Sequence, residues 1–295
     1  MASANRALLR RIRTVQNTRK ITKTMELVAA SKLRRAAERV TSARPYAEAL
    51  REVLGDLIAP DLVDAFPLLR TPVAPSKGSP TRAAVVLVTS NRGLCGAFNS
   101  NLIKEARRRI AALEADGYTV DVYAIGKKGA GFFRFAGRKA ALERADIGDK
   151  PTAAHAAELA EPLMAAFIAG TLGRVEFVHT RYNSPLSTPP VTTQVLPIEP
   201  PAARDTRKKH DYLLAPSAGA ILEELLPLYV RNAIYRGLVE TAAGEHGARR
   251  TAMKSATDNA QELMGTLKRS YNRQRQAGIT QELSEIVGGA AALEG

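Results

Sequence analysis

The sequence predicts an α/β protein in which two long terminal helices form an antiparallel two-stranded coiled coil and flank an inserted domain with a mainly parallel sheet. Three observations support this fold class. Apolar residues recur at helical spacing at both ends of the 295-residue chain, and short apolar runs alternate with helical stretches in its middle. Two stretches rich in helix-breaking residues, 71–80 and 197–205, separate these parts. We therefore expect an N-terminal helix within residues 1–70, a middle domain at 80–200 and a C-terminal helix at 210–295.

The first part is expected to be one helix from Ser3 to about residue 57, bent at Pro45. Residues 1–44 hold twelve Lys and Arg but only Glu26 and Glu38, so most of the formal net charge of +14 lies here. A basic excess favours an anionic partner: nucleic acid, an anionic membrane or an acidic protein. Although an acid-free start also fits a transit peptide, the apolar rhythm continues past Met25, which favours a retained helix.

The middle part predicts strands at 83–89, 118–125 and 174–182, separated by helices near 97–114 and 152–170. The first strand is apolar throughout, as expected for a strand covered on both faces. A further run at 191–196 predicts an antiparallel edge strand. No stretch approaches the roughly 20 apolar residues of a membrane-spanning helix.

The C-terminal part predicts a second helix from about Ser217 to Ala292, with Pro227 at its start or at a kink. One narrow apolar stripe on each long helix favours a coiled coil over two members of a larger bundle. The expected core residues are Leu8, Ile12, Val15, Met253, Ala260, Leu263 and Leu267.

The register of the coiled coil follows from reading the two stripes in opposite directions. This pairs Leu8 with Leu267 and Thr22 with Met253, and it places Glu26 opposite Arg249. The helix end beyond about residue 274 is then left without a partner.

Two glycine-rich turns follow strands, at Thr89–Asn99 and Gly126–Gly131, where phosphate is often bound. Neither has the spacing of a phosphate-binding loop or of a dinucleotide fingerprint, so a structural turn is favoured while nucleotide binding stays open. The four histidines are scattered and Cys95 is single, which gives no metal or redox motif. We expect no catalytic, cofactor or metal site.

Three segments resemble F-type ATP synthase gamma subunits. They are Gln16–Met25 with its continuation to Tyr46, Thr89–Asn99, and the run from Ala252 to Val287, including Ala252–Asn259, Arg275–Gln276 and Ile279–Val287. These segments lie at both ends and the centre of the chain, in the family's order. The resemblance implies a coiled-coil shaft with an inserted Rossmann-like domain that binds no nucleotide.

The resemblance also implies a function without a catalytic site: the central rotating shaft of a proton-translocating ATP synthase, coupling ion flow through the membrane ring to changes at the beta-subunit sites. The implied partners are the alpha and beta subunits, the epsilon subunit and the membrane c-ring, with one copy of the chain per complex and no nucleic acid. The implied location is peripheral, on the cytoplasmic face of the bacterial plasma membrane. The alternative from the residues alone is a basic coiled-coil nucleic-acid binder.

The resemblance assigns roles to residues of both helices. The expected beta-subunit contacts are Lys20, Lys23, Met25, Arg249, Arg275, Gln276, Thr280 and Glu285. The expected bearing tail, a small apolar surface that turns without directional hydrogen bonds, includes Ile286, Val287 and Leu293. Gly244 and Gly247 stand where Ser and Ala are common in the family. Each glycine costs a helix about 1 kcal/mol against Ala, which leaves the stiffness of the helix open at this point.

Overall fold

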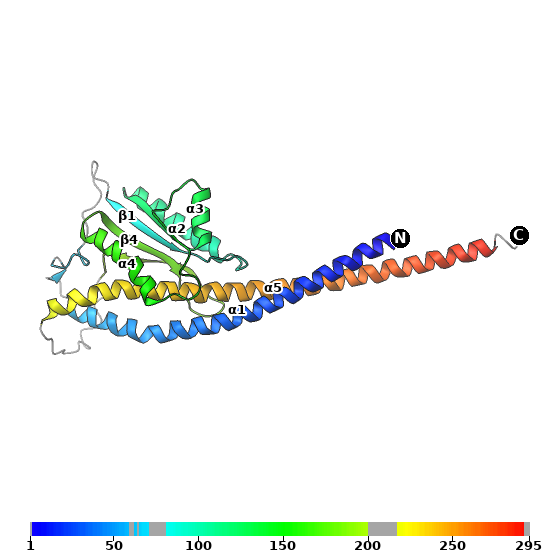
Figure 1. Cartoon of the computed structure of the whole chain (residues 1–295), viewed down its shortest axis with the longest axis horizontal. Coiled ribbons are helices and arrows are strands. Elements are labelled where there is room, and N and C mark those ends of the chain that lie inside the picture. Colours follow the sequence, from blue (N-terminus) through cyan, green and yellow to red (C-terminus); the bar gives the residue numbers. More distant parts are fainter. Residues whose placement is uncertain (1, 59–61, 64, 71–80, 200–216, 292–295) are drawn as a thin grey trace. The chain divides into compact units, whose positions relative to one another are not determined.

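A computed structural model describes residues 2–58, 62–63, 65–70, 81–199 and 217–291 (Figure 1). The chain divides into two compact units, Met1–Ala29 with Arg250–Gly295 and Ala30–Arg249, which are described separately below. The elements in chain order are α1 (Ala2–Leu57), β1 (Arg82–Val88), α2 (Phe98–Ala115), β2 (Thr119–Ile125), α3 (Lys127–Phe135), β3 (Leu142–Arg144), α4 (Ala153–Ile168), β4 (Leu172–Thr180), β5 (Pro190–Leu196) and α5 (Ala218–Ala291).

The larger unit contains one five-stranded sheet in the order β3-β2-β1-β4-β5. Four strands are parallel, and β5 pairs antiparallel with β4, as the sequence predicted for this edge. The α/β class with a mainly parallel sheet between two long helices is confirmed. Two elements were not predicted, α3 and the short strand β3. The glycines of α3 had been interpreted as part of a turn, because glycine is a weak helix former.

Successive residues of β1 point to opposite faces of the sheet, and both faces are covered. Ala84, Val86 and Val88 belong to a core formed with α4, the end of α1 and the first part of α5. The alternate residues pack against α2 and α3 on the other face. This explains why the strand is apolar throughout.

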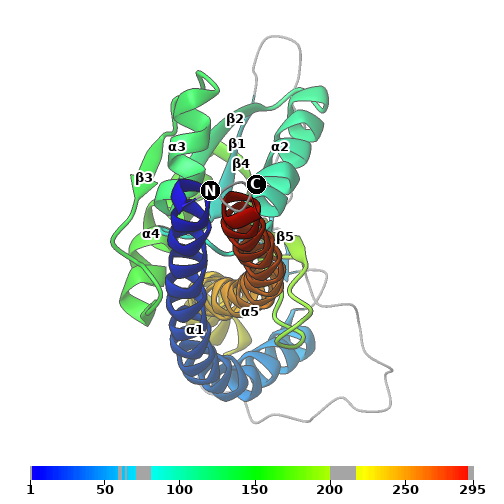
Figure 2. The same cartoon turned by 90° about the vertical axis from the view of Figure 1, so that its right-hand side faces the viewer.

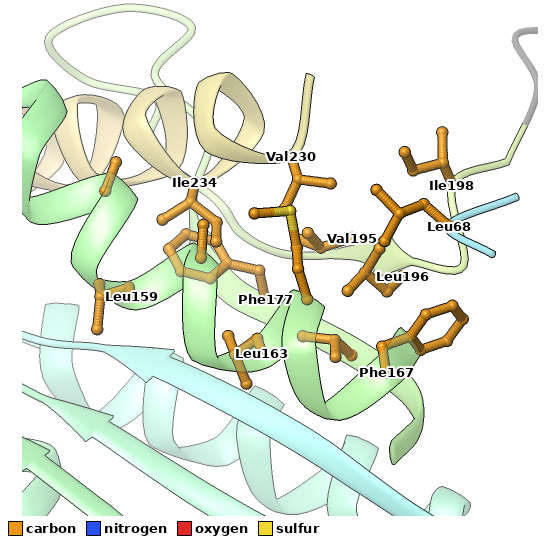
Figure 3. Packing of buried hydrophobic residues seen from close by; sticks show 14 of the residues in the cluster. Leu68, Leu159, Leu163, Phe167, Phe177, Val195, Leu196, Ile198, Val230 and Ile234 are labelled. Carbon is orange, nitrogen blue, oxygen red and sulfur yellow. The ribbon is translucent and has the colours of Figure 1, made fainter. Parts of the chain in front are cut away.

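The α5 side of the first core is a stripe with a step of four residues. Leu222, Leu226, Val230, Ile234 and Leu238 are all buried against the sheet unit. Figure 3 shows Val230 and Ile234 above Phe177 of β4, with Leu159 and Leu163 of α4 close by. Burying a side chain of this size contributes about 1.5 to 3 kcal/mol. The helix continues through Pro227, because packing on both sides of the proline offsets the lost hydrogen bond.

The other long helix, α1, likewise continues through Pro45. Its last turns place Ala47, Leu50 and Leu54 in buried positions, and these contacts hold the helix beyond the proline. Neither proline ends its helix.

In the smaller unit, the N-terminal part of α1 lies beside the C-terminal part of α5, and both views show the two helices adjacent (Figures 1 and 2). The contacts between them correct the predicted register. The Thr22 hydroxyl lies 2.8 Å from that of Thr257, and Arg19 donates a hydrogen bond of 2.6 Å to Gln261. Thr22 was expected opposite Met253, so the partner helix is shifted by about one turn.

The seam of the smaller unit contains Ile12, Met264 and Leu267, with Leu8 and Val15 packed beside them. Met253 and Ala260 are buried as well. Leu263 was predicted in this seam but is 46% exposed, and Met264 takes its place. The apolar pattern offered two neighbouring residues, and the shifted register selects the second.

The predicted pair of Glu26 and Arg249 is also corrected. Glu26 pairs with Lys23 on its own helix at 3.2 Å, and Arg249 pairs with Glu245 at 2.7 Å. Each pair joins two residues of the same helix, so neither pair depends on how the two long helices are aligned.

Candidate functional site

The carboxyl ends of β1 and β2 are where parallel sheets most often bind ligands. Here the chain's own groups occupy the amides that a phosphate would need. At the start of α3, the Lys127 amide donates to the Asn91 side chain at 3.0 Å and the Gly129 amide to the Thr89 hydroxyl at 2.9 Å. The Lys128 amide donates to the Ser90 carbonyl oxygen at 3.2 Å. These bonds support the interpretation of the second glycine-rich segment, Gly126–Gly131, as a structural turn whose amides are bonded to the first segment.

Gly126 shows why the second segment needs glycine. Its φ is +99°, and a Cβ atom there would lie 2.1 Å from the Thr89 carbonyl oxygen. The turn therefore brings two strand ends together closely. A cavity beside it, between the strand ends and α5, has about 20 Å³ of space, enough for one water molecule. A nucleotide does not fit in this cavity.

A segment of α5, residues 237–247, is buried on all sides; we call it the collar segment. Leu33, Ala36 and Val40 of α1 pack against its Val239 and Ala243. The end of β4 and the loops that follow β1 and β4 cover the remaining sides. A helix that is enclosed all round must be narrow, and its sequence GLVETAAGEHG is rich in small residues.

Three glycines of the collar segment lie where an added Cβ atom would meet a neighbouring atom at 3.1 Å or less. A Cβ atom on Gly237 would lie 2.3 Å from the Phe177 ring, and one on Gly244 would lie 2.8 Å from the Thr180 hydroxyl. On Gly247 it would lie 3.1 Å from the Pro185 carbonyl oxygen. These glycines therefore permit close packing around the helix, a role that the sequence analysis did not assign to Gly244 and Gly247.

Hydrogen bonds also join the collar segment and the adjacent Arg249 to neighbouring elements. The Tyr182 amide donates to Glu240 at 3.0 Å and the Thr180 amide to Thr241 at 3.3 Å, so the end of β4 is bonded to the helix. Arg249, directly beyond the segment, donates to the Gly93 carbonyl oxygen at 3.3 Å. These bonds satisfy backbone groups that would otherwise be buried without partners.

On another side, one carboxylate connects three elements. Asp149, in the loop before α4, accepts a 2.5 Å bond from Lys32 of α1 and lies 3.5 Å from the His246 Nε2 atom of α5. The hydrogen bond from Lys32 lowers the pKa of Asp149, and burial lowers the pKa of His246 to about 4. Burial raises the pKa of Glu245, although the nearby Arg249 acts in the opposite direction. At neutral pH, His246 is therefore uncharged and acts as a hydrogen-bonding group.

No role was predicted for these residues from the sequence. The four histidines are scattered along the chain, but His246 belongs to the collar segment and His155 caps the start of α4. Lys32 and Asp149 are 117 residues apart, so no local pattern could have paired them.

Most residues expected to contact a beta subunit have exposed side chains. Lys20 and Lys23 are exposed on α1, while Met25 is half-buried. The expected contacts on the last part of α5, which are all exposed, are Arg275, Gln276, Thr280 and Glu285. Arg249 differs, because its side chain is only 11% exposed and its donors are used within the chain.

The expected bearing tail is described only in part. Ile286 and Val287 are 68% and 66% exposed, whereas Leu293 lies outside the described residues. Exposed apolar side chains also occur on α1, at Ile21, Leu27 and Val28. Among the described residues, no helix is long and apolar enough to cross a bilayer.

Comparison with known proteins decides the family. The family model described as ATP synthase matches residues 4–293. An ATP synthase gamma chain of Gemmatimonas aurantiaca is 60% identical over 286 residues, covering 97% of each chain, and one of Frankia casuarinae is 42% identical over 99% of each chain. The chain belongs to the ATP synthase gamma chain family. Family membership confirms the prediction of a central-stalk subunit of a membrane-associated ATP synthase, without a catalytic site of its own.

Solved structures agree on the fold. A chain of the Euglena gracilis mitochondrial ATP synthase matches with a TM-score of 0.67, at 20% identity, over 99% of this chain and 95% of that one. A rotor chain from the same source has a TM-score of 0.65. The alternative of a nucleic-acid binder finds no support in these relatives.

Proposed function

We propose that this chain is the rotating shaft of an F-type ATP synthase, present in one copy, which couples proton flow through a membrane ring to ATP synthesis on beta subunits. The observation that supports this most strongly is the full-length identity of 60% to a gamma chain. The partners are then the alpha and beta subunits of the catalytic head, the epsilon subunit and the c-ring. The location is the cytoplasmic face of the bacterial plasma membrane, where the chain is held peripherally.

A shaft can drive chemistry only through contacts that differ from one catalytic site to the next. Moving a site between 1% and 99% occupancy of one conformation requires about 5.5 kcal/mol of differential binding. One exposed ion pair supplies at most about 1 kcal/mol. Several contacts must therefore change together as the shaft turns.

The smaller unit offers such a surface because its two helices expose different side chains. On α1, the exposed apolar side chains of Ile21, Leu27 and Val28 lie close in sequence to the exposed Lys20 and Lys23. The exposed face of α5 beyond residue 270 is mostly polar, interrupted by a few apolar side chains. A surface that differs around its axis presents a different face to each of three surrounding beta subunits. The basic α1 residues would meet acidic loops on those subunits.

We propose that Arg275 and Gln276 form the contact through which the shaft engages a beta subunit, and that Thr280 and Glu285 lie close to this contact. All four side chains are exposed, so their loss removes no core packing. Ile286 and Val287 would turn in an apolar sleeve, where the absence of directional hydrogen bonds prevents locking.

The experiment is a double substitution in the complete synthase reconstituted in vesicles. Arg275→Ala with Gln276→Ala should lower coupled ATP synthesis about thirtyfold, because two contacts of about 1 kcal/mol each are lost and each 1.4 kcal/mol corresponds to about a factor of ten. The matched control is Asn272→Ala with Arg273→Ala, an exposed pair one turn earlier on the same helix. The control should synthesise ATP at nearly the wild-type rate. Equal rates for both double variants would contradict the assignment.

A further inference from the structure

The collar segment must transmit any twist between the sheet and the long helices of the shaft. Apolar packing resists separation, but it opposes sliding or rotation only weakly, because it is non-directional. Hydrogen bonds and ion pairs have preferred geometry and resist such displacement. The polar contacts of the collar segment are therefore the groups most able to fix its angular position.

Most of these contacts join α5 to one other element. Tyr182 and Thr180 join it to the end of β4, and Arg249 joins it to the loop after β1. Asp149 is different, because its carboxylate faces groups on both α1 and α5. Its side chain is about one third exposed, so the contact is only partly screened by solvent.

The tautomer of the neutral His246 ring follows from its contact with Arg249. The Arg249 guanidinium lies 3.4 Å from His246 Nδ1, and since arginine can only donate, Nδ1 is the acceptor. The proton of the neutral ring is then on Nε2, which faces Asp149 at 3.5 Å. A continuous chain of polar contacts runs from the Gly93 carbonyl through Arg249 and His246 to Asp149, and from there to Lys32.

We propose that Asp149 is a positioning residue for torque, which ties α1 and α5 to the sheet domain at the same point so that both helices turn with it. Lys32 and His246 are the groups through which it acts on the two helices. The inference rests on the proposed function, because it concerns how a rotating shaft carries load. It adds a role for a loop residue outside the surfaces that face the catalytic head.

The test measures the torsional stiffness of the shaft in the complete synthase. The catalytic head is fixed to a surface, and a rod is attached through a cysteine at the exposed position Lys139 in a chain with Cys95→Ser. The variance of the rod's thermal angular fluctuations is inversely proportional to the stiffness. A purely structural contribution to folding would change the unfolding temperature without changing this variance.

Asp149→Ala should raise the variance at least twofold, and Asp149→Asn should give an intermediate value because the amide still accepts hydrogen bonds. His246→Ala should also raise it, whereas His246→Gln, which can both donate and accept, should leave it near the wild-type value. The control is Glu143→Ala, which removes a carboxylate that pairs with Arg134 at 2.6 Å inside the sheet domain. Its variance should not change.

Unchanged variance in Asp149→Ala would overturn the inference, as would an equal increase in Glu143→Ala. The same preparation tests the proposed function separately, because the rod on the wild-type chain must rotate when ATP is added. A wild-type rod that does not rotate contradicts the proposed function. A rotating wild type with an unaffected Asp149→Ala variant contradicts only the role of Asp149.

Discussion

Replacing Gly237 with Ala should destabilise the larger unit, although alanine is the better helix former. The added Cβ atom would lie 2.3 Å and 2.8 Å from two carbons of the Phe177 ring and 3.2 Å from His179. Phe177 is 1% exposed and enclosed by the core, so the ring cannot move aside freely. Overpacking of this kind costs about 1 to 3 kcal/mol, and we expect the upper end because the overlap is severe.

Alanine's higher helix preference acts in the opposite direction and adds about 1 kcal/mol to the free energy of unfolding. The net loss in the free energy of unfolding is then about 2 kcal/mol. For a unit of this size, that corresponds to a fall of about 4 to 8 °C in the unfolding temperature. The measurement is thermal unfolding of the full chain, followed by circular dichroism.

Gly131 provides the matched control in the same unit. It also lies within a helix, but a Cβ atom there would have no neighbour within 4 Å. Gly131→Ala should therefore raise the unfolding temperature slightly, by the helix preference alone. If Gly237→Ala unfolds at or above the wild-type temperature, the collar segment is not closely packed around this glycine.

Two further predictions concern the register and the pH dependence. In a chain with Cys95→Ser, the double variant Thr22→Cys with Thr257→Cys should oxidise readily to a disulfide, because the hydroxyls of Thr22 and Thr257 are 2.8 Å apart. The double variant Thr22→Cys with Met253→Cys should not. The reverse result on a non-reducing gel would restore the register predicted from sequence. Because burial holds the pKa of His246 at about 4, below its ordinary 6.5, the folded state is favoured above pH 6.5 and this contribution is lost as the pH falls from 6.5 towards 4. Unfolding temperatures measured across this range should fall less steeply for His246→Gln than for the wild type, since glutamine does not titrate there; equal slopes would show that His246 does not contribute. The charged groups Arg249, Asp149, Lys32 and Arg35 also act on this ring, and all four are retained in the variant.

The sheet was predictable because its signals are local. The apolar run of β1 indicated a strand covered on both faces, and the run at 191–196 indicated an antiparallel edge strand. The shortest strand, β3, has three residues and no apolar pattern. Its pairing with β2 depends on contacts that a local sequence pattern does not encode.

The coiled-coil register was less predictable because several alignments of a weak apolar stripe have similar energies. The apolar stripe alone placed Leu263 in the seam, but polar contacts at Thr22 and Arg19 accompany a different alignment. A hydrogen bond contributes about 0.5 to 1.5 kcal/mol, similar to the difference between alternative apolar pairs. Ranking apolar residues alone therefore could not identify the alignment.

For the glycines of α5, helix preference alone does not determine the stiffness of the segment. Considered as an isolated helix, two glycines close together lose about 2 kcal/mol of helix preference. In the folded chain, Gly244 lets β4 approach and Gly247 lets the following loop approach. The close approach accompanies hydrogen bonds from the Thr180 and Tyr182 amides to the helix. The free energy of each such hydrogen bond is similar to the helix preference that one glycine loses, so the bonds offset this loss. The surrounding elements also leave the enclosed helix no space to bend. The stiffness of this segment is therefore a property of its surroundings, and substitutions that improve helix preference there should weaken the shaft rather than strengthen it.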